Sequence, residues 1–241
     1  MSLKRVLFWV VFFSIAMGFL ESAVVIYLRS VMYPGGFTFP LRPLNHNLAV
    51  VELWREAATI VMLLAVGMLV GKNKAERLAY FILSFAVWDI FYYVFLYVFL
   101  AWPESLFTWD ILFLIPVPWV GPVITPVLIA LTMIAFALTI IRCSSHGKVV
   151  SLQAKEIGLL VMGSAVAVAS FIEDYVRQNG AIVYQKLNSG GNLLSEMGSY
   201  VPDRFDWPLF AMGEGLLVLA YILYCRRMKI FAKAPVNVAS A

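Results

Sequence analysis

The stretch WVGPVITPVLIALTMIAFALTII, residues 119–141, contains no Asp, Glu, Lys or Arg and is followed directly by Arg142. An α-helix needs about 20 predominantly apolar residues to cross the hydrocarbon core of a bilayer, so this stretch predicts a transmembrane helix. Further apolar runs of comparable length lie near 6–28, 48–70, 78–101, 156–176 and 207–225. The sequence therefore predicts an all-α bundle of six transmembrane helices.

The composition of the whole chain indicates the same class of protein. Of the 241 residues, 62% are hydrophobic and 13% are charged, whereas soluble domains carry about 25% charged residues. A single soluble core of this length cannot bury so much apolar surface. We therefore expect one polytopic membrane domain over residues 1–241, with the lipid bilayer as its surroundings.

A shorter apolar segment follows the third predicted helix. Residues 105–115 are too few to span a bilayer, and they end at Pro116-Val117-Pro118. Irregular backbone at membrane depth is tolerated only where it is buried in protein or lines a cavity. We interpret this segment as an interfacial or re-entrant half-helix on the outer side of the bundle.

The basic residues predict the orientation. If the N-terminus is cytoplasmic, most of the 18 Lys and Arg residues lie at cytoplasmic helix ends, as the positive-inside rule requires. The exceptions are Arg55, within a helix, and the outer residues Arg29, Arg42, Arg177, Lys186 and Arg204. We expect both termini in the cytoplasm, in a cytoplasmic or inner membrane. The net charge of +4 is thereby explained without nucleic acid, which we exclude as a partner.

Acidic residues within the predicted helices are the main candidates for function. They are Glu21, Glu52, Glu56, Asp89 and Glu214. A carboxylate in hydrocarbon is costly unless it is paired, protonated or hydrated, so such residues mark binding sites or polar contacts between helices. Their positions along the helices place all five in the outer half of the membrane. We predict that they converge on one outward-facing polar pocket.

Two of these positions have neighbours that suggest partners. Arg55 lies three residues after Glu52 and one before Glu56, and Glu52 and Glu56 share its helix face because residues four apart are neighbours. Arg55 either forms a local ion pair only, or also binds an anionic group of a substrate. Asp89 precedes Tyr92 and Tyr93 by three and four residues. A phenol there is placed to donate to the Asp89 carboxylate, and the alternative is that Asp89 couples to a proton or a cation.

Other acids have simpler interpretations. Glu214 lies between Gly213 and Gly215, which permits a tight helix crossing with a glutamate hydrogen bond across it. Glu173 and Asp174 lie at the outer end of the fifth predicted helix, where we expect them to be solvated.

The charges of the predicted pocket are unbalanced. Five acids and one arginine cannot all be ionised at low dielectric without compensation. The compensating positive charge would come from protons, sodium, a divalent metal or a cationic substrate. A metal would be held by oxygen ligands from Glu52, Glu56, Asp89 and Glu214, and oxygen ligands favour Mg, Ca or Mn.

The sequence indicates the function less directly than the fold. The sequence contains no HExxH, no GxSxG, no GxxxxGK[ST] and no GxGxxG after a strand, the motifs of several large enzyme classes. Three hypotheses remain. The first, which we favour, is a carrier or binding subunit for a cation or small polar solute, with possible proton coupling. The second is an intramembrane carboxylate- or metal-dependent enzyme acting on a lipid-linked substrate. The third is an accessory or scaffold subunit that binds a membrane-protein partner or a second copy of itself.

Overall fold

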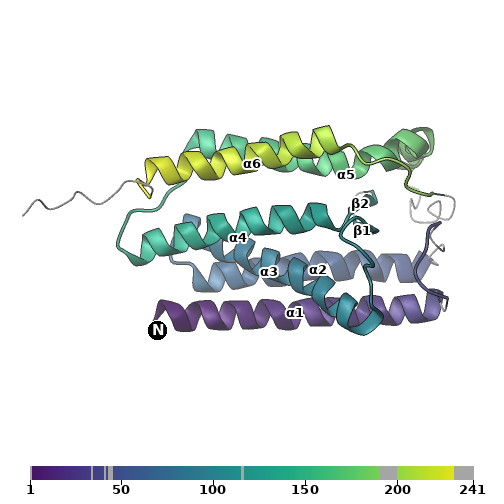
Figure 1. Cartoon of the computed structure of the whole chain (residues 1–241), viewed down its shortest axis with the longest axis horizontal. Helices are drawn as coiled ribbons and strands as arrows, with labels where there is room; N and C mark the ends of the chain where they lie inside the picture. Colours follow the sequence, from purple (N-terminus) through teal and green to yellow (C-terminus); the bar gives the residue numbers. More distant parts are fainter. Residues whose placement is uncertain are drawn as a thin grey trace, which may run out of the picture.

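The computed structural model describes residues 2–33, 35–40, 42, 46–114, 117–189 and 200–230. Six long helices dominate it (Figure 1): α1 (Leu3–Met32), α2 (His46–Val70), α3 (Lys74–Leu100), α4 (Ile124–Ser145), α5 (Ala154–Ser189) and α6 (Trp207–Arg227). All six contain a segment long and apolar enough to cross a membrane. The predicted six-helix membrane bundle is therefore confirmed as an architecture.

Local signals define the helix ends. Asn73 precedes α3, and its side chain accepts a hydrogen bond from the Glu76 backbone N–H at 3.0 Å. Asp206 precedes α6 and accepts from the Leu209 N–H at 2.9 Å. Each cap satisfies a backbone donor that has no partner within its helix. α3 ends where Ala101 adopts a left-handed conformation with φ of 51°, a common way to terminate a helix.

The helices lie side by side and run alternately in opposite directions (Figure 1). α3 is central to one group and packs against α1, α2 and α4, while α5 and α6 pair chiefly with each other. The start of α1 and the end of α6 lie at the same end of the bundle. The α1–α2 and α3–α4 connections lie at the opposite end.

The predicted half-helix near 105–115 is wrong. Residues Trp109–Phe113 form strand β1, which pairs antiparallel with β2 (Trp119–Pro122) in the register Trp109↔Pro122 and Asp110↔Gly121. Residue 115, the end of the predicted element, lies outside the described residues. A short apolar run bounded by prolines does not distinguish a strand from a helix segment. Because β2 takes up residues 119–122, α4 begins at Ile124 rather than near 119.

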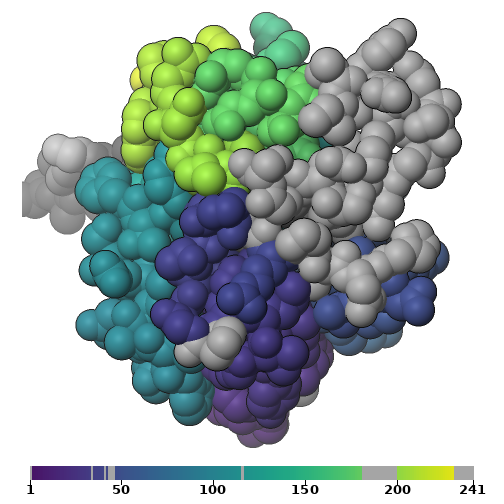
Figure 2. Space-filling view, turned by 90° about the vertical axis from the view of Figure 1, so that its right-hand side faces the viewer, coloured from purple at the N-terminus to yellow at the C-terminus, as the bar shows by residue number. Residues whose placement is uncertain are grey.

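Figure 2 shows the end of the molecule that carries this hairpin. The segment that follows α1, in dark purple and blue, lies across the middle of this face. The chain that follows α3, in teal, lies beside it, and the described part of α5 and the beginning of α6 lie above it in green and yellow-green. Several connections thus meet at this end, above the site described below.

Close helix packing holds α5 against α6. A Cβ atom added at Gly213 would lie 2.6 Å from the Ala167 backbone nitrogen, whereas one added at Gly215 would meet no atom within 4 Å. We therefore expect Gly213→Ala to lower the free energy of unfolding by about 1–3 kcal/mol, the usual cost of overpacking. Gly215→Ala is the matched control and should leave it unchanged. Thermal unfolding of both variants in detergent measures the difference, and equal melting temperatures would contradict this helix crossing.

Candidate functional site

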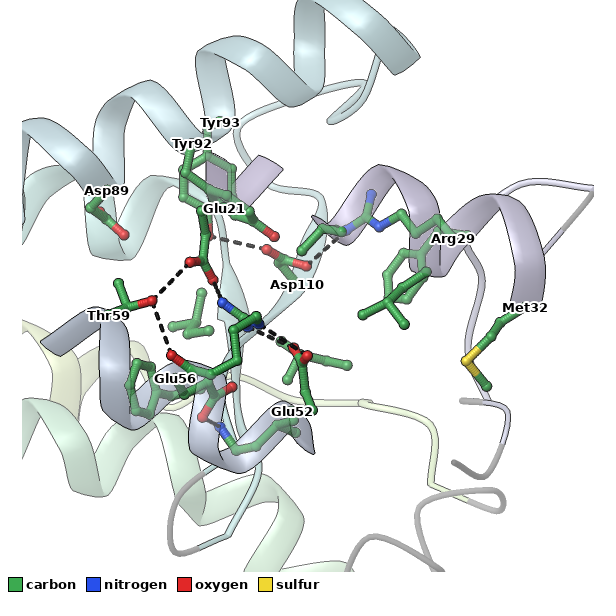
Figure 3. Close-up of a pocket in the computed structure, with 18 of the residues that line it drawn as sticks. Glu21, Arg29, Met32, Glu52, Glu56, Thr59, Asp89, Tyr92, Tyr93 and Asp110 are labelled. Atoms are coloured by element: carbon green, nitrogen blue, oxygen red, sulfur yellow. Dashed lines mark hydrogen bonds and ion pairs between the residues drawn. The ribbon is translucent and has the colours of Figure 1, made fainter. Parts of the chain in front are cut away.

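A cavity of about 170 Å³ lies among α1, α2, α3 and β1 (Figure 3). Five carboxyl groups line it, from Glu21, Glu52, Glu56, Asp89 and Asp110. Three guanidinium groups, from Arg29, Arg42 and Arg55, also line it. One water molecule needs about 10–15 Å³ of such space, so the cavity has room for a small polar solute.

Arg55 forms the centre of one ion-pair cluster. Its Nε and Nη2 donate to the two oxygens of Glu52 at 3.0 and 2.6 Å, and its Nη1 donates to Glu21 on α1. Thr59 donates to the other oxygen of Glu21 at 3.2 Å. Of the two acids on its own helix, Arg55 thus pairs with Glu52 and not with Glu56, and the contact to Glu21 joins α1 to α2. Two carboxylates thus take up three of the five N–H donors of this guanidinium.

Glu56 has a different partner from its neighbour Glu52. Its Oε2 accepts a hydrogen bond from the Leu114 backbone N–H at 3.1 Å, and the residue is 6% exposed. Leu114 directly follows β1, so this contact ties the hairpin to α2. No described residue is within hydrogen-bonding distance of the other Glu56 oxygen.

A second ion pair lies in the same cavity. Arg29 on α1 donates to Asp110 on β1 at 3.3 Å, and Tyr93 donates to the other Asp110 oxygen at 3.2 Å. The Arg29 guanidinium carbon lies 4.3 Å from the Phe37 ring centre and 3.8 Å from that of Trp102. Stacking on aromatic rings stabilises a desolvated guanidinium. This pair therefore fixes the hairpin against α1 and α3.

The environment of Asp110 opposes its ionisation. The residue is 2% exposed, and burial raises the pKa of its carboxyl to about 6, although Arg29 acts to lower it. Burial raises a carboxyl pKa because the charged form loses its hydration. Neither partner was predicted from the sequence, since Arg29 was assigned to an outer helix end and Asp110 to a half-helix. The available signal was a lone acid within the apolar run Trp109–Phe113.

Asp89 differs from the other acids of the cavity. It is half-buried on α3, and no described residue lies within hydrogen-bonding distance of its carboxylate. Figure 3 shows it apart from the network of dashed contacts. The predicted donation from a neighbouring phenol is wrong, because Tyr93 donates to Asp110 instead. Asp89 therefore lines the cavity as an unpaired carboxyl group.

Glu214 does not join this group. It lies on α6, accepts a hydrogen bond from Thr132 of α4, and is not among the residues that line the cavity. Of the five predicted acids, Glu21, Glu52, Glu56 and Asp89 thus line one cavity, and Glu214 lies elsewhere. The physical reason is that α6 packs against α5 and α4, whereas the cavity lies among α1, α2 and α3.

The predicted metal ligands are not gathered into a metal site. In the described part of the chain, no three His, Cys, Asp or Glu side chains are placed to hold a metal ion. Glu52 is occupied by Arg55 and Glu56 by a backbone N–H, while Glu214 lies elsewhere. The arrangement therefore does not fit the predicted Mg, Ca or Mn site at Glu52, Glu56, Asp89 and Glu214.

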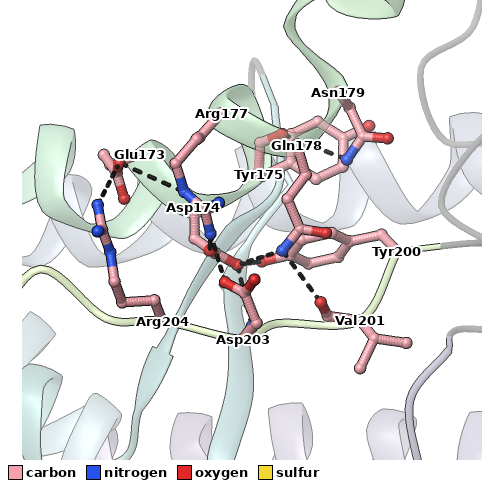
Figure 4. Close-up of polar contacts among 10 residues, drawn as sticks. All are labelled: Glu173, Asp174, Tyr175, Arg177, Gln178, Asn179, Tyr200, Val201, Asp203 and Arg204. Carbon is pink, nitrogen blue, oxygen red and sulfur yellow. Dashed lines mark hydrogen bonds and ion pairs between the residues drawn. The ribbon is translucent and has the colours of Figure 1, made fainter.

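A further polar cluster, between α5 and the chain that precedes α6, has a structural role (Figure 4). Asp174 was expected to be solvated but is 2% exposed. It accepts hydrogen bonds from Tyr200, Arg177 and Gln178 at 2.7, 2.5 and 3.1 Å. Glu173 pairs with Arg204 at 3.4 Å. These contacts attach the chain that precedes α6 to α5, which is why Asp174 is buried.

Comparison with known proteins adds no further information on this site. No protein-family model, curated protein or solved structure matches the chain. The geometry of the cavity is therefore the basis for a functional proposal.

Proposed function

We propose that the protein is a membrane carrier that binds a small organic cation in the cavity among α1, α2, α3 and β1, with Asp89 as the principal anionic contact. The observation that carries this proposal is the unpaired Asp89 carboxyl at the cavity wall. Acids are rare within membrane-spanning helices, where they are costly to keep, and those present commonly mark a substrate or ion pathway.

The charge of the cavity supports a cationic ligand. Its five carboxyl groups exceed its three guanidinium groups by two. The buried guanidinium groups of Arg29 and Arg55 are already engaged by Asp110, Glu21 and Glu52. A bound cation next to Asp89 would compensate one of these two charges without separating either ion pair.

The aromatic wall supports an organic cation over a bare metal ion. Trp88, Tyr92 and Tyr93 line the same cavity as Asp89. Aromatic faces attract ammonium groups, and the combination of rings with a carboxylate is typical of sites for substituted ammonium ions. The volume of about 170 Å³ restricts the ligand to a small solute.

The cavity lies within the group of helices that packs around α3, while α5 and α6 form a separate pair. Binding and transport are therefore tested separately. The distribution of Lys and Arg predicts that the cavity opens on the outer side.

Calorimetric titration of the purified protein in nanodiscs tests the binding step. The ligands are choline, methylammonium and tetramethylammonium, with 3,3-dimethylbutan-1-ol as the uncharged analogue of choline. We expect saturable binding of at least one cation and none of the alcohol. Equal binding of choline and the alcohol, or no binding of any cation, would overturn the proposal. Exchange of the cation across the membrane of proteoliposomes is measured next. A carrier catalyses this exchange, whereas a binding subunit does not.

A further inference from the structure

A second cavity, an open cleft lined by exposed basic residues, lies at the other end of the bundle, where α4 and α6 end. Its volume is about 330 Å³. Arg142, His146 and Lys148, at and after the end of α4, line it together with Lys229, which follows α6. None of the described residues that line it is acidic. It is thus a basic counterpart of the acidic cavity at the opposite end.

The cations of this cavity are not paired. Arg142, Lys148 and Lys229 form no ion pair with any residue in the described ranges. By contrast, Arg227 at the same end of the bundle binds both oxygens of Glu156, at 2.8 and 2.9 Å. Ion pairs thus form at this end of the bundle, but the three cations of the cavity take part in none of those described.

One contact positions a cation at the cavity. Lys148 Nζ donates to the Met228 backbone oxygen at 2.9 Å, which links the chain after α4 to the chain after α6. An ammonium group has three donors, so the remaining ones are free for a ligand. Attraction to carbonyl groups at helix C-termini accounts for basic residues at these positions, but it does not account for a shared cavity between them.

We propose that this cavity, the basic end cavity, binds an anionic phosphate group. Guanidinium and ammonium groups together are the common means of holding phosphate oxygens. The ends of α4 and α6 are the ends of membrane-spanning helices, so the cavity lies at the level of lipid headgroups. Basic pockets between helices in this position bind anionic headgroups. A lipid headgroup and a soluble phosphate share this chemistry.

The test compares two double variants that remove the same charge. Arg142→Gln with Lys229→Gln removes two cavity cations. Lys74→Gln with Arg226→Gln removes two exposed cations that do not line the cavity. Native mass spectrometry counts bound lipid while phosphatidylglycerol is titrated against a phosphatidylcholine background. A parallel titration with inorganic phosphate in phosphatidylcholine nanodiscs, followed by thermal unfolding, measures soluble phosphate.

We expect the wild type and the Lys74/Arg226 variant to retain phosphatidylglycerol with equal apparent affinity. The Arg142/Lys229 variant should bind it at least about tenfold more weakly, since each charge-assisted hydrogen bond contributes about that factor. Stabilisation by inorganic phosphate with the same dependence on Arg142 and Lys229 would identify a soluble ligand instead of a lipid. Equal behaviour of the two double variants, or no effect of either phosphate source on the wild type, would overturn the proposal.

Discussion

Replacing Arg55 with glutamine is expected to lower the free energy of unfolding by about 3 kcal/mol or more, because it leaves buried carboxylates without their counter-ion. Arg55 is bound to Glu21 on α1 and Glu52 on α2, and the side chains of both acids are 11% exposed. Direct packing between α1 and α2 is sparse. The variant should therefore lose the attachment of α2 to α1 as well as the ion pair. Thermal unfolding in detergent measures the loss.

The matched control removes the acids together with the arginine. In the triple variant E21Q/E52Q/R55Q no charge is left unpaired in the cluster, and we expect most of the stability to return. If the single variant Arg55→Gln is as stable as the wild type, the cluster is hydrated in the membrane and does not hold the helices together. If the triple variant is no more stable than the single one, the loss comes from packing of the Arg55 side chain.

Replacing Arg29 with glutamine is expected to have a similar effect, of about 3 kcal/mol at neutral pH, since Asp110 is then buried without a counter-ion. The effect should depend on pH. Burial raises the pKa of Asp110 to about 6, above the usual value of about 3.9. The native state therefore takes up this proton at a higher pH than the unfolded chain does. Protonation of Asp110 therefore raises the free energy of unfolding as the pH falls through about 6, and this contribution is lost as the pH rises.

Without Arg29 the pKa of Asp110 should rise further, so acid should partly rescue the variant. We expect the difference in melting temperature between Arg29→Gln and the wild type to be smaller at about pH 5 than at about pH 7.5. The double variant R29Q/D110N has no carboxyl group at this position, and this part of the pH dependence should disappear. A constant difference across the pH range in both variants would show that the Arg29–Asp110 pair does not govern stability.

The helices were predictable because each carries its own signal. An apolar run such as 119–141 has to leave water wherever it lies in the fold, so length and composition suffice to identify it. The segment over 105–115 carries no such signal. Its apolar residues are compatible with a strand or a helix, and the partner strand at 119–122 was absorbed into the predicted fourth helix. The choice between strand and helix depends on pairing of the two segments across the turn, which neither segment specifies alone.

The site was predictable only where partners lie close in sequence. Glu52 and Arg55 are three residues apart, and their ion pair follows from helix geometry. Arg29 and Asp110 are separated by 81 residues, so their pairing depends on how β1 docks against α1. Glu214 illustrates the same difficulty. Its depth was inferred from its position along α6, but its distance from the cavity depends on the neighbours of α6.

The role of Asp89 in binding is tested by a calorimetric titration of choline, or of whichever cation binds the wild type most tightly, into three proteins in parallel. They are the wild type, Asp89→Asn and Glu214→Gln. Glu214 is also an acid within a membrane-spanning helix, but it lies outside the cavity. We predict that Asp89→Asn weakens binding by about ten- to a hundredfold, the effect of losing one charge-assisted contact, and that Glu214→Gln binds as the wild type does. Undiminished binding by Asp89→Asn would contradict the assignment of the cation site to this cavity.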